Sequence, residues 1–136
     1  MAIVTTLGRK VNVLSGTYEA AVDLSDLQFC AVVASGASTG KVKIAAPAAQ
    51  GALSMGILQT YDCDAAEQGE VLEEGISKAV ADSTFDSGVE LTPSGTDGKL
   101  EGASGADYVI AIALEAATAA DQQVTVRVVS PYQKNA

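Results

Sequence analysis

The stretch IALEAATAADQQVTVRVV, which runs from Ile112 to Val129, decides between a helical and a β fold for this chain. It opens with Ala, Leu and Glu, which are good helix formers. It ends in strict alternation, with Val124, Val126 and Val128 on one side and Thr125, Arg127 and Val129 on the other. Alternation of this kind is typical of a strand with one buried face. The Ala-rich connector Glu115–Asp121 is too short for an independent helix, so we predict strand, connector, strand.

The same patterns recur along the chain and predict a mainly β protein. Alternating or short apolar runs bounded by Gly, Pro, Ser and Asp clusters indicate strands. They occur at Lys10–Ser15, Phe29–Ala34, Lys41–Ala45, Leu53–Gln59, Glu70–Ala81, Gly88–Thr92, Gly98–Gly102, Tyr108–Glu115 and Val124–Ser130. The longest carries Gly75, which predicts a bulge or bend. Asp23–Gln28 is expected to form at most a short turn of helix.

A degenerate internal repeat accompanies the strands. Gly40-Lys41-Val42 matches Gly98-Lys99-Leu100, Leu58-Gln59 matches Leu114-Glu115, AAEQ (65–68) matches AADQ (119–122), and Val71 matches Val124. The offsets of 58, 56, 54 and 53 differ only by small deletions. We predict two superposable halves, 29–72 and 89–126, with the two Gly-Lys turns in equivalent places. The fold expected is a compact β-sandwich or small β-barrel with an internal pseudo-duplication, since closing a sheet protects its edges.

Length and composition limit the classes of function. The 136 residues suit one domain, and no apolar run approaches the roughly 18 residues that span a bilayer. No signal peptide is visible, and two cysteines without a disulfide framework favour synthesis in a reducing cytoplasm. The net charge of −9 argues against an electrostatic grip on nucleic acid or on anionic membranes. The absence of histidine removes the commonest general base, and the scarcity of aromatics argues against an aromatic-lined ligand pocket.

The cysteines and acidic clusters offer candidate chemistry, and for each the structural interpretation is favoured. Cys63 lies between Asp62 and Asp64, whose charges raise rather than lower a thiol pKa, so we expect an ordinary loop cysteine. Cys30, in an apolar run, is expected in the core, without a disulfide to Cys63. No metal and no cofactor are expected. The oxygen-rich set Asp62, Asp64 and Glu67 lacks the spacing of a calcium loop, and the carboxylates Glu70, Glu73 and Glu74 lack a sugar-binding aromatic surface.

The N-terminal segment MAIVTTLGR (1–9) is apolar, polar and basic in turn. It is either an extended arm that adds to a neighbouring sheet or the first strand of this domain, and the sequence does not separate the two. As an arm, it divides the chain into residues 1–9 and a single β domain at 10–136. Its partner-binding side chains are expected to be Ile3, Val4, Leu7, Arg9 and Lys10.

An ordered series of segments carries a resemblance to a known family. The segments are DLSDLQFCAVV (23–33), GKVKIAAPAAQGALSMGILQ (40–59), AAEQGEVLEEGISKAVA (65–81) and DYVIAIALEAATAADQQVTVRVV (107–129). Together, over roughly residues 18 to 129, they resemble the small head decoration, or capsid cement, proteins of tailed bacteriophages. Ala111 replaces a family glycine, while Gln68-Gly69 and Gln122-Gln123 stand at the two family turns, so these turns are expected to be less tight.

The resemblance implies a non-enzymatic structural protein on the exterior of an icosahedral head. It implies binding to the major capsid protein, a homo-oligomer with a trimer favoured, synthesis in the host cytoplasm and a place on the capsid exterior of the virion. Two other classes stay open: a β-barrel binding module for a small ligand or glycan, and an enzyme, which the missing histidines disfavour.

Overall fold

The computed structural model describes residues 14–36 and 40–135, and within these ranges the chain is all β, with no helix. This confirms the mainly β fold. The nine strands are β1 (Leu14–Glu19), β2 (Ala31–Ser35), β3 (Lys43–Ala45), β4 (Gly56–Leu58), β5 (Gln68–Val80), β6 (Glu90–Pro93), β7 (Leu100–Gly102), β8 (Tyr108–Ala113) and β9 (Gln123–Gln133).

Most predicted strands are present, and the differences fall at their ends. The opening stretch is strand, connector and strand, with β8 ending at Ala113 and β9 starting at Gln123. Val124, Val126 and Val128 are buried, as the alternation predicts. The segment Asp23–Gln28 forms no helical turn, because Leu24 is instead drawn into a bridge with Cys63. β1 extends to Glu19, beyond the predicted Lys10–Ser15, of which residues 10–13 lie outside the described residues.

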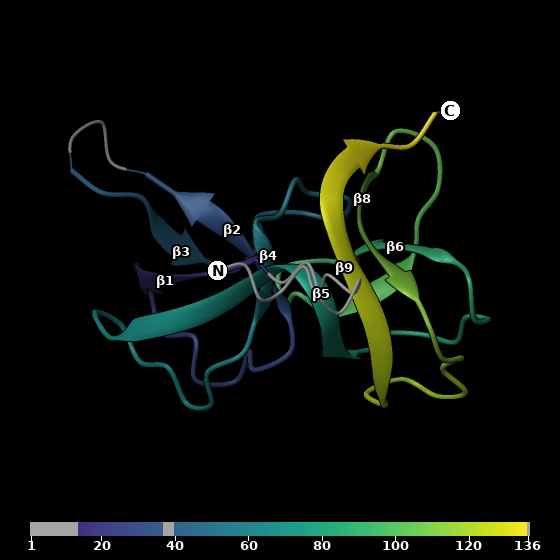
Figure 1. The fold of residues 1–136 in the computed structure, drawn as a ribbon, viewed down its shortest axis with the longest axis horizontal. Helices are drawn as coiled ribbons and strands as arrows, with labels where there is room; N and C mark the ends of the chain where they lie inside the picture. Colours follow the sequence, from purple (N-terminus) through teal and green to yellow (C-terminus); the bar gives the residue numbers. More distant parts are fainter. Residues whose placement is uncertain (1–13, 37–39, 136) are drawn as a thin grey trace, which may run out of the picture.

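The strand order is symmetric about the β5–β9 pair. Along the sheet it runs β3-β2-β4-β5-β9-β8-β6-β7, with β1 added to β5. The pairing among β2, β3, β4 and the start of β5 is therefore repeated among β6, β7, β8 and β9. Figure 1 shows the two groups side by side, with the long strand β5 running from one to the other. The predicted duplication is present in the topology, and both Gly-Lys turns lie in the hairpin loops β2–β3 and β6–β7.

β5 serves both groups because it bends at Gly75, where φ is 137°. Residues 68–74 pair with β1 and β4, and residues 75–80 pair with β9. We call residues 14–74 the first half and 75–135 the second half. In each half the sheet curls until a single parallel bridge joins its edges, Ala20 to Ile44 in one and Ala81 to Leu100 in the other.

The register of the repeat differs from the one predicted by matching letters. The two equivalent bridges make Ile44 the structural counterpart of Leu100, whereas the sequence match aligned Val42 with Leu100. By their positions in the strand ladders, Val71 is the counterpart of Val126 rather than Val124. Leu58 is likewise the counterpart of Ala113 rather than Leu114. The predicted pairs are wrong by one or two residues. The cause is that backbone hydrogen bonding, not residue identity, sets strand register.

Backbone geometry supports the structural alignment. Three residue pairs with positive φ occupy equivalent places: Phe29 and Gly88, Gly51 and Ala106, and Ala66 and Asp121. Four of these six are not glycine, and such residues seldom adopt positive φ. The turns at Ala66 and Asp121 donate equivalent amides, to Ala20 O at 2.9 Å and to Ala81 O at 2.7 Å. The two halves therefore share their loops as well as their strands.

Each half has its own core. The first consists of Ala20, Leu24, Val32, Ile44, Leu58, Cys63 and Val71. Its equivalents, Ala81, Phe85, Leu91, Leu100, Ala113, Ala117 and Val126, all lie in the second core, which also includes Ala31, Ile57 and Leu72 from the first half. The halves are thus joined by apolar packing as well as by β5.

A short segment of the first half fills a gap in the second. Val80 N donates to Phe29 O at 3.0 Å, and Ala31 N donates to Gly98 O at 2.8 Å. The segment 29–31 therefore lies between the end of β5 and the β6–β7 turn, like an added strand. It packs so closely that a Cβ at Gly98 would come within 2.5 Å of Ala31 O.

Candidate functional site

The arm residues predicted to bind a partner, Ile3, Val4, Leu7, Arg9 and Lys10, lie outside the described residues. Their role stays a prediction. The described chain begins at Leu14, whose side chain is 52 % exposed at the start of β1. The first described residue of the chain is therefore an exposed apolar one.

Cys63 is not the loop cysteine that the sequence predicts. Its side chain is fully buried in the first core, because the bridge to Leu24 pulls the segment into the sheet. Burial and the nearby carboxylates of Glu67 and Asp64 raise its pKa. Cys30 lies in the interior as predicted; burial, with a smaller effect of Asp97, raises its pKa to about 11. Both thiols are free.

Two of the acidic residues singled out in the sequence, Glu67 and Glu73, have hydrogen-bond partners. Glu67 Oε1 accepts a hydrogen bond from Asp64 N at 2.8 Å, which caps the turn before β5. The carboxylates of Asp62 and Glu67 raise the pKa of Asp64. Glu73 accepts a hydrogen bond from the Tyr18 hydroxyl at 2.9 Å. Over the described ranges, no three His, Cys, Asp or Glu side chains are grouped to hold a metal ion, and no helix is long and apolar enough to cross a membrane.

The outer side of the β5–β9 pair carries the candidate interaction surface. Ile76 and Lys78 on β5 lie opposite Arg127 and Thr125 on β9. Ile76 is 56 % exposed, and Lys78 and Arg127 are exposed as well. We call these four residues, with Leu14 on the adjoining β1, the β5–β9 face. It combines large exposed aliphatic side chains with two cations.

The cations of this face have no ion-pair partner among the described residues. Lys43, Lys99 and Lys134 form the ion pairs of that part of the chain, with Glu19, with Asp97 and Asp121, and with Glu90. Lys78 only donates a hydrogen bond to Thr125 Oγ1 at 3.3 Å. A positive charge without a close counter-charge is available to an anionic group on a partner.

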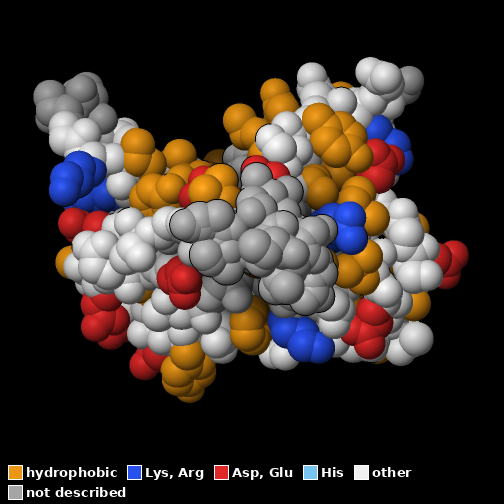
Figure 2. Space-filling view, viewed as in Figure 1, with side chains coloured by type: hydrophobic (Ala, Val, Ile, Leu, Met, Phe, Trp, Pro, Cys, Tyr) orange, Lys and Arg blue, Asp and Glu red, His pale blue; other side chains and the backbone are white. Residues whose placement is uncertain are grey.

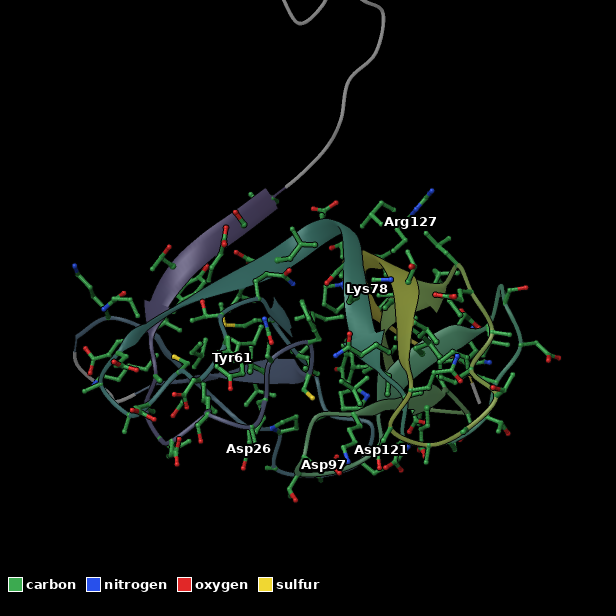
Figure 3. The ribbon with its side chains drawn as sticks, turned by 90° about the horizontal axis from the view of Figure 1, so that it is seen from below. Asp26, Tyr61, Lys78, Asp97, Asp121 and Arg127 are labelled. Carbon is green, nitrogen blue, oxygen red and sulfur yellow. The ribbon has the colours of Figure 1, made fainter. Side chains whose placement is uncertain are left out.

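Charge is distributed unevenly between the two sides of the molecule. Figure 3 shows Arg127 at the upper edge with Lys78 below it on β5, and Asp26, Asp97 and Asp121 near the lower edge. The space-filling view of the other direction shows basic, acidic and hydrophobic side chains interspersed over the described surface (Figure 2). In a chain of net charge −9, the β5–β9 face is therefore the side best suited to an anionic or mixed partner surface.

Sequence reasoning missed this face, although a signal for it was present. Arg127 stands on the polar side of the Val124–Val129 alternation, and Lys78 stands two residues after Ile76. The alternation predicted that Arg127 points away from the core. Only the pairing of β5 with β9 shows that Arg127 and Ile76 lie side by side.

A second feature is a groove between β1 and β3. Its volume is about 500 Å³, and its lining residues are Thr17, Tyr18, Glu19, Lys41, Val42, Lys43 and Gln68. Two of these lining residues form an ion pair, with 3.0 Å between Lys43 Nζ and Glu19 Oε2. We call it the β1–β3 groove, and the Ala20–Ile44 bridge joins the same two edges of the sheet.

The fold is similar to that of a phage head fiber. The crystal structure of the N base of head fiber gp8.5 of bacteriophage phi29 superposes with a TM-score of 0.65. The match covers 88 % of this chain and 96 % of that one, at 20 % sequence identity. At this identity the similarity shows the fold. No protein-family model and no curated protein sequence matches the chain significantly.

Proposed function

We propose that this chain is a non-enzymatic structural protein of a phage head, a decoration or cement protein that binds the outer surface of the capsid. The observation that carries the proposal is the fold shared with the phi29 head fiber base. The ordered series of segments between residues 18 and 129 is a property of the sequence alone, and it supports the same class.

The partner we propose is the major capsid protein, contacted through the β5–β9 face. A protein bound across several capsid subunits adds buried area that must be lost before the subunits separate, which stabilises the shell by linkage. Ile76 and Leu14 supply exposed apolar area for such a contact. Lys78 and Arg127 supply charge complementarity, which steers association and selects the partner.

The experiment measures binding to capsids of the phage that encodes the chain, prepared without their decoration protein. The variant Lys78→Gln/Arg127→Gln changes the net charge from −9 to −11. The control Ser83→Glu/Ser87→Glu makes the same change of −2 on exposed loop positions elsewhere. We expect the first variant to raise the capsid Kd about tenfold or more, and the control to bind like the unmodified chain.

Two results would contradict different parts of this proposal. If the unmodified chain does not co-sediment with capsids, the proposed function is wrong. If it does, and the two variants bind equally well, the β5–β9 face is not the docking surface. Melting temperatures of both variants establish that the exchanged surface residues leave the fold intact.

A further inference from the structure

The β1–β3 groove has a counterpart in the second half that is already filled. By the structural alignment, Glu19 corresponds to Val80 and Val42 corresponds to Gly98. In the second half the segment 29–31 occupies this place, bonded to Val80 N and Gly98 O. In the first half the described residues leave the space open. The gap between the sheet edges therefore holds an extended backbone segment in one half and is open to such a segment in the other.

The walls of the groove present backbone groups suited to such a segment. Ala20 N bonds to Glu67 O on the β5 side, and Ala21 N bonds to Ile44 O on the β3 side. Backbone groups on an antiparallel strand alternate between its two edges. Thr17 and Glu19 therefore direct their N–H and C=O groups away from β5, toward the groove. This is the arrangement of an open sheet edge that can accept an added strand.

The occupant cannot be an identical copy of the segment that fills the second half. That segment approaches Gly98 so closely that no Cβ fits there. The groove instead has Val42, whose side chain is 49 % exposed. An occupant must leave room for Val42, and it gains by covering it with an apolar side chain.

Residues 2–8 of this chain have the matching chemistry. The sequence AIVTTLG is uncharged and rich in β-branched residues, which favour strands. Ile3 and Leu7 can cover Val42. The next residues, Arg9 and Lys10, are basic, and the neighbouring part of β5 carries Glu70, Glu73 and Glu74. The segment and its surroundings are complementary in both apolarity and charge.

The reach of the chain favours a neighbouring copy over the same copy as the donor. If Lys10–Val13 continue β1, as their alternation predicts, Lys10 lies about 27 Å from Tyr18, eight residues along the strand. Thr5, in the middle of the segment, lies at most about 18 Å from Lys10, five residues away. With this arrangement the segment would fall short of the middle of its own groove, which favours a second molecule as the donor.

We propose that the β1–β3 groove binds residues 2–8 of a second copy of this chain as an added strand. The partner copy thereby completes the edge of the first half, as 29–31 does in the second. The proposal concerns the isolated protein and does not rest on capsid binding. It also assigns the arm its partner, which the sequence left open.

The first test is the oligomeric state by native mass spectrometry and sedimentation of the full chain. We expect an oligomer, with a trimer the state that the family resemblance favours. Deletion of residues 2–8 or Val42→Glu should raise the dissociation constant about tenfold or more, with melting of the dissociated monomer nearly unchanged. The control Leu114→Glu alters an apolar side chain of similar exposure, 44 %, in the second half and should leave assembly unchanged.

The second test asks whether the segment that fills the groove comes from a second copy or from the same chain. A chain lacking residues 2–8 and carrying Val42→Cys is mixed with a full-length chain carrying Leu7→Cys, and the mixture is oxidised gently. We expect a disulfide-linked heterodimer, and we expect a synthetic peptide of residues 1–10 to bind the deleted chain and to compete with its formation.

Three outcomes overturn the proposal: a monomeric full-length chain, an oligomer insensitive to both the deletion and Val42→Glu, or no cross-link and no peptide binding. None of these bears on whether the protein binds capsids, so this proposal and the proposed function fail independently.

Discussion

At the scale of single residues, burial decides the chemistry of the two thiols. Cys63 belongs to the first core, and both Cys30 and Cys63 are buried and nearly inaccessible to solvent. In both, burial is the largest cause of a raised pKa, since it disfavours the charged thiolate. The thiolate is the reactive species, so neither residue has the environment of a nucleophile.

We predict that both thiols resist alkylation in the folded protein near pH 8 and react fully after unfolding without reductant. The measurement is a thiol titration in buffer and in guanidinium chloride. A fast-reacting thiol in the folded protein, or fewer than two thiols in the unfolded one, would contradict this assignment.

Asp107 is the other residue whose environment has a measurable consequence. Its carboxylate accepts hydrogen bonds from Ser104 N at 2.9 Å and Gln50 Nε2 at 3.0 Å, and its side chain is largely buried. The hydrogen bond from Ser104 N is the main cause that lowers its pKa. A lowered folded-state pKa means that the stabilisation is complete above the unfolded pKa of about 4. It is lost as pH falls through the lower folded value.

Replacing Asp107 with Ala should therefore lower the free energy of unfolding by about 1–3 kcal/mol at pH 7. The difference from the unmodified protein should shrink below about pH 4, as the carboxylate takes up a proton. Urea unfolding at pH 7 and at pH 3 measures both values. A difference that stays constant with pH would show that the ionised form of Asp107 makes no contribution.

At the scale of elements, the fit between the segment 29–31 and the β6–β7 turn depends on a glycine. Gly98 has a φ of 72°, and a Cβ there would meet Ala31 O at 2.5 Å and Ala31 N at 3.0 Å. Both atoms belong to backbone, which cannot move aside as a side chain can. Gly95, in the same loop, has open space around its Cα.

We expect Gly98→Ala to destabilise the protein by at least about 1–3 kcal/mol, from the strained φ and from the loss of the hydrogen bond to Ala31. Gly95→Ala, the control, should change stability by less than about 0.5 kcal/mol, as an open surface substitution does. Chemical denaturation compares the two. Equal effects would mean that the segment 29–31 does not pack against the turn.

At the scale of the whole molecule, the two halves are bound together in three ways. They share β5, the segment 29–31 of one half completes the other, and Ala31, Ile57 and Leu72 of the first half belong to the core of the second. If the first half unfolds, the second half loses three members of its core and its hydrogen bonds to the segment 29–31. The duplication in sequence is therefore not expected to produce independent units.

Calorimetry at a concentration where the protein is dissociated should accordingly show one transition, with equal calorimetric and van't Hoff enthalpies. Two resolved transitions would show that the halves unfold separately and that the contacts across β5 contribute little.

The sequence by itself determined the strands, the buried side of each and the existence of a repeat. These are local properties: alternation assigns Val124, Val126 and Val128 to one side of β9 whatever β9 pairs with, and turn residues mark where strands end. The bend at Gly75 was also predictable, because a glycine inside a long alternating run has no other evident role.

Only the tertiary structure decided the register of the repeat, the burial of Cys63, the β5–β9 face and the β1–β3 groove. Each of these depends on which strands lie side by side, and backbone hydrogen bonds between distant segments are independent of side-chain identity. Ile76 and Arg127 are 51 positions apart, yet the β5–β9 ladder places them opposite each other. A period of two specifies which way a side chain points but not what it meets there.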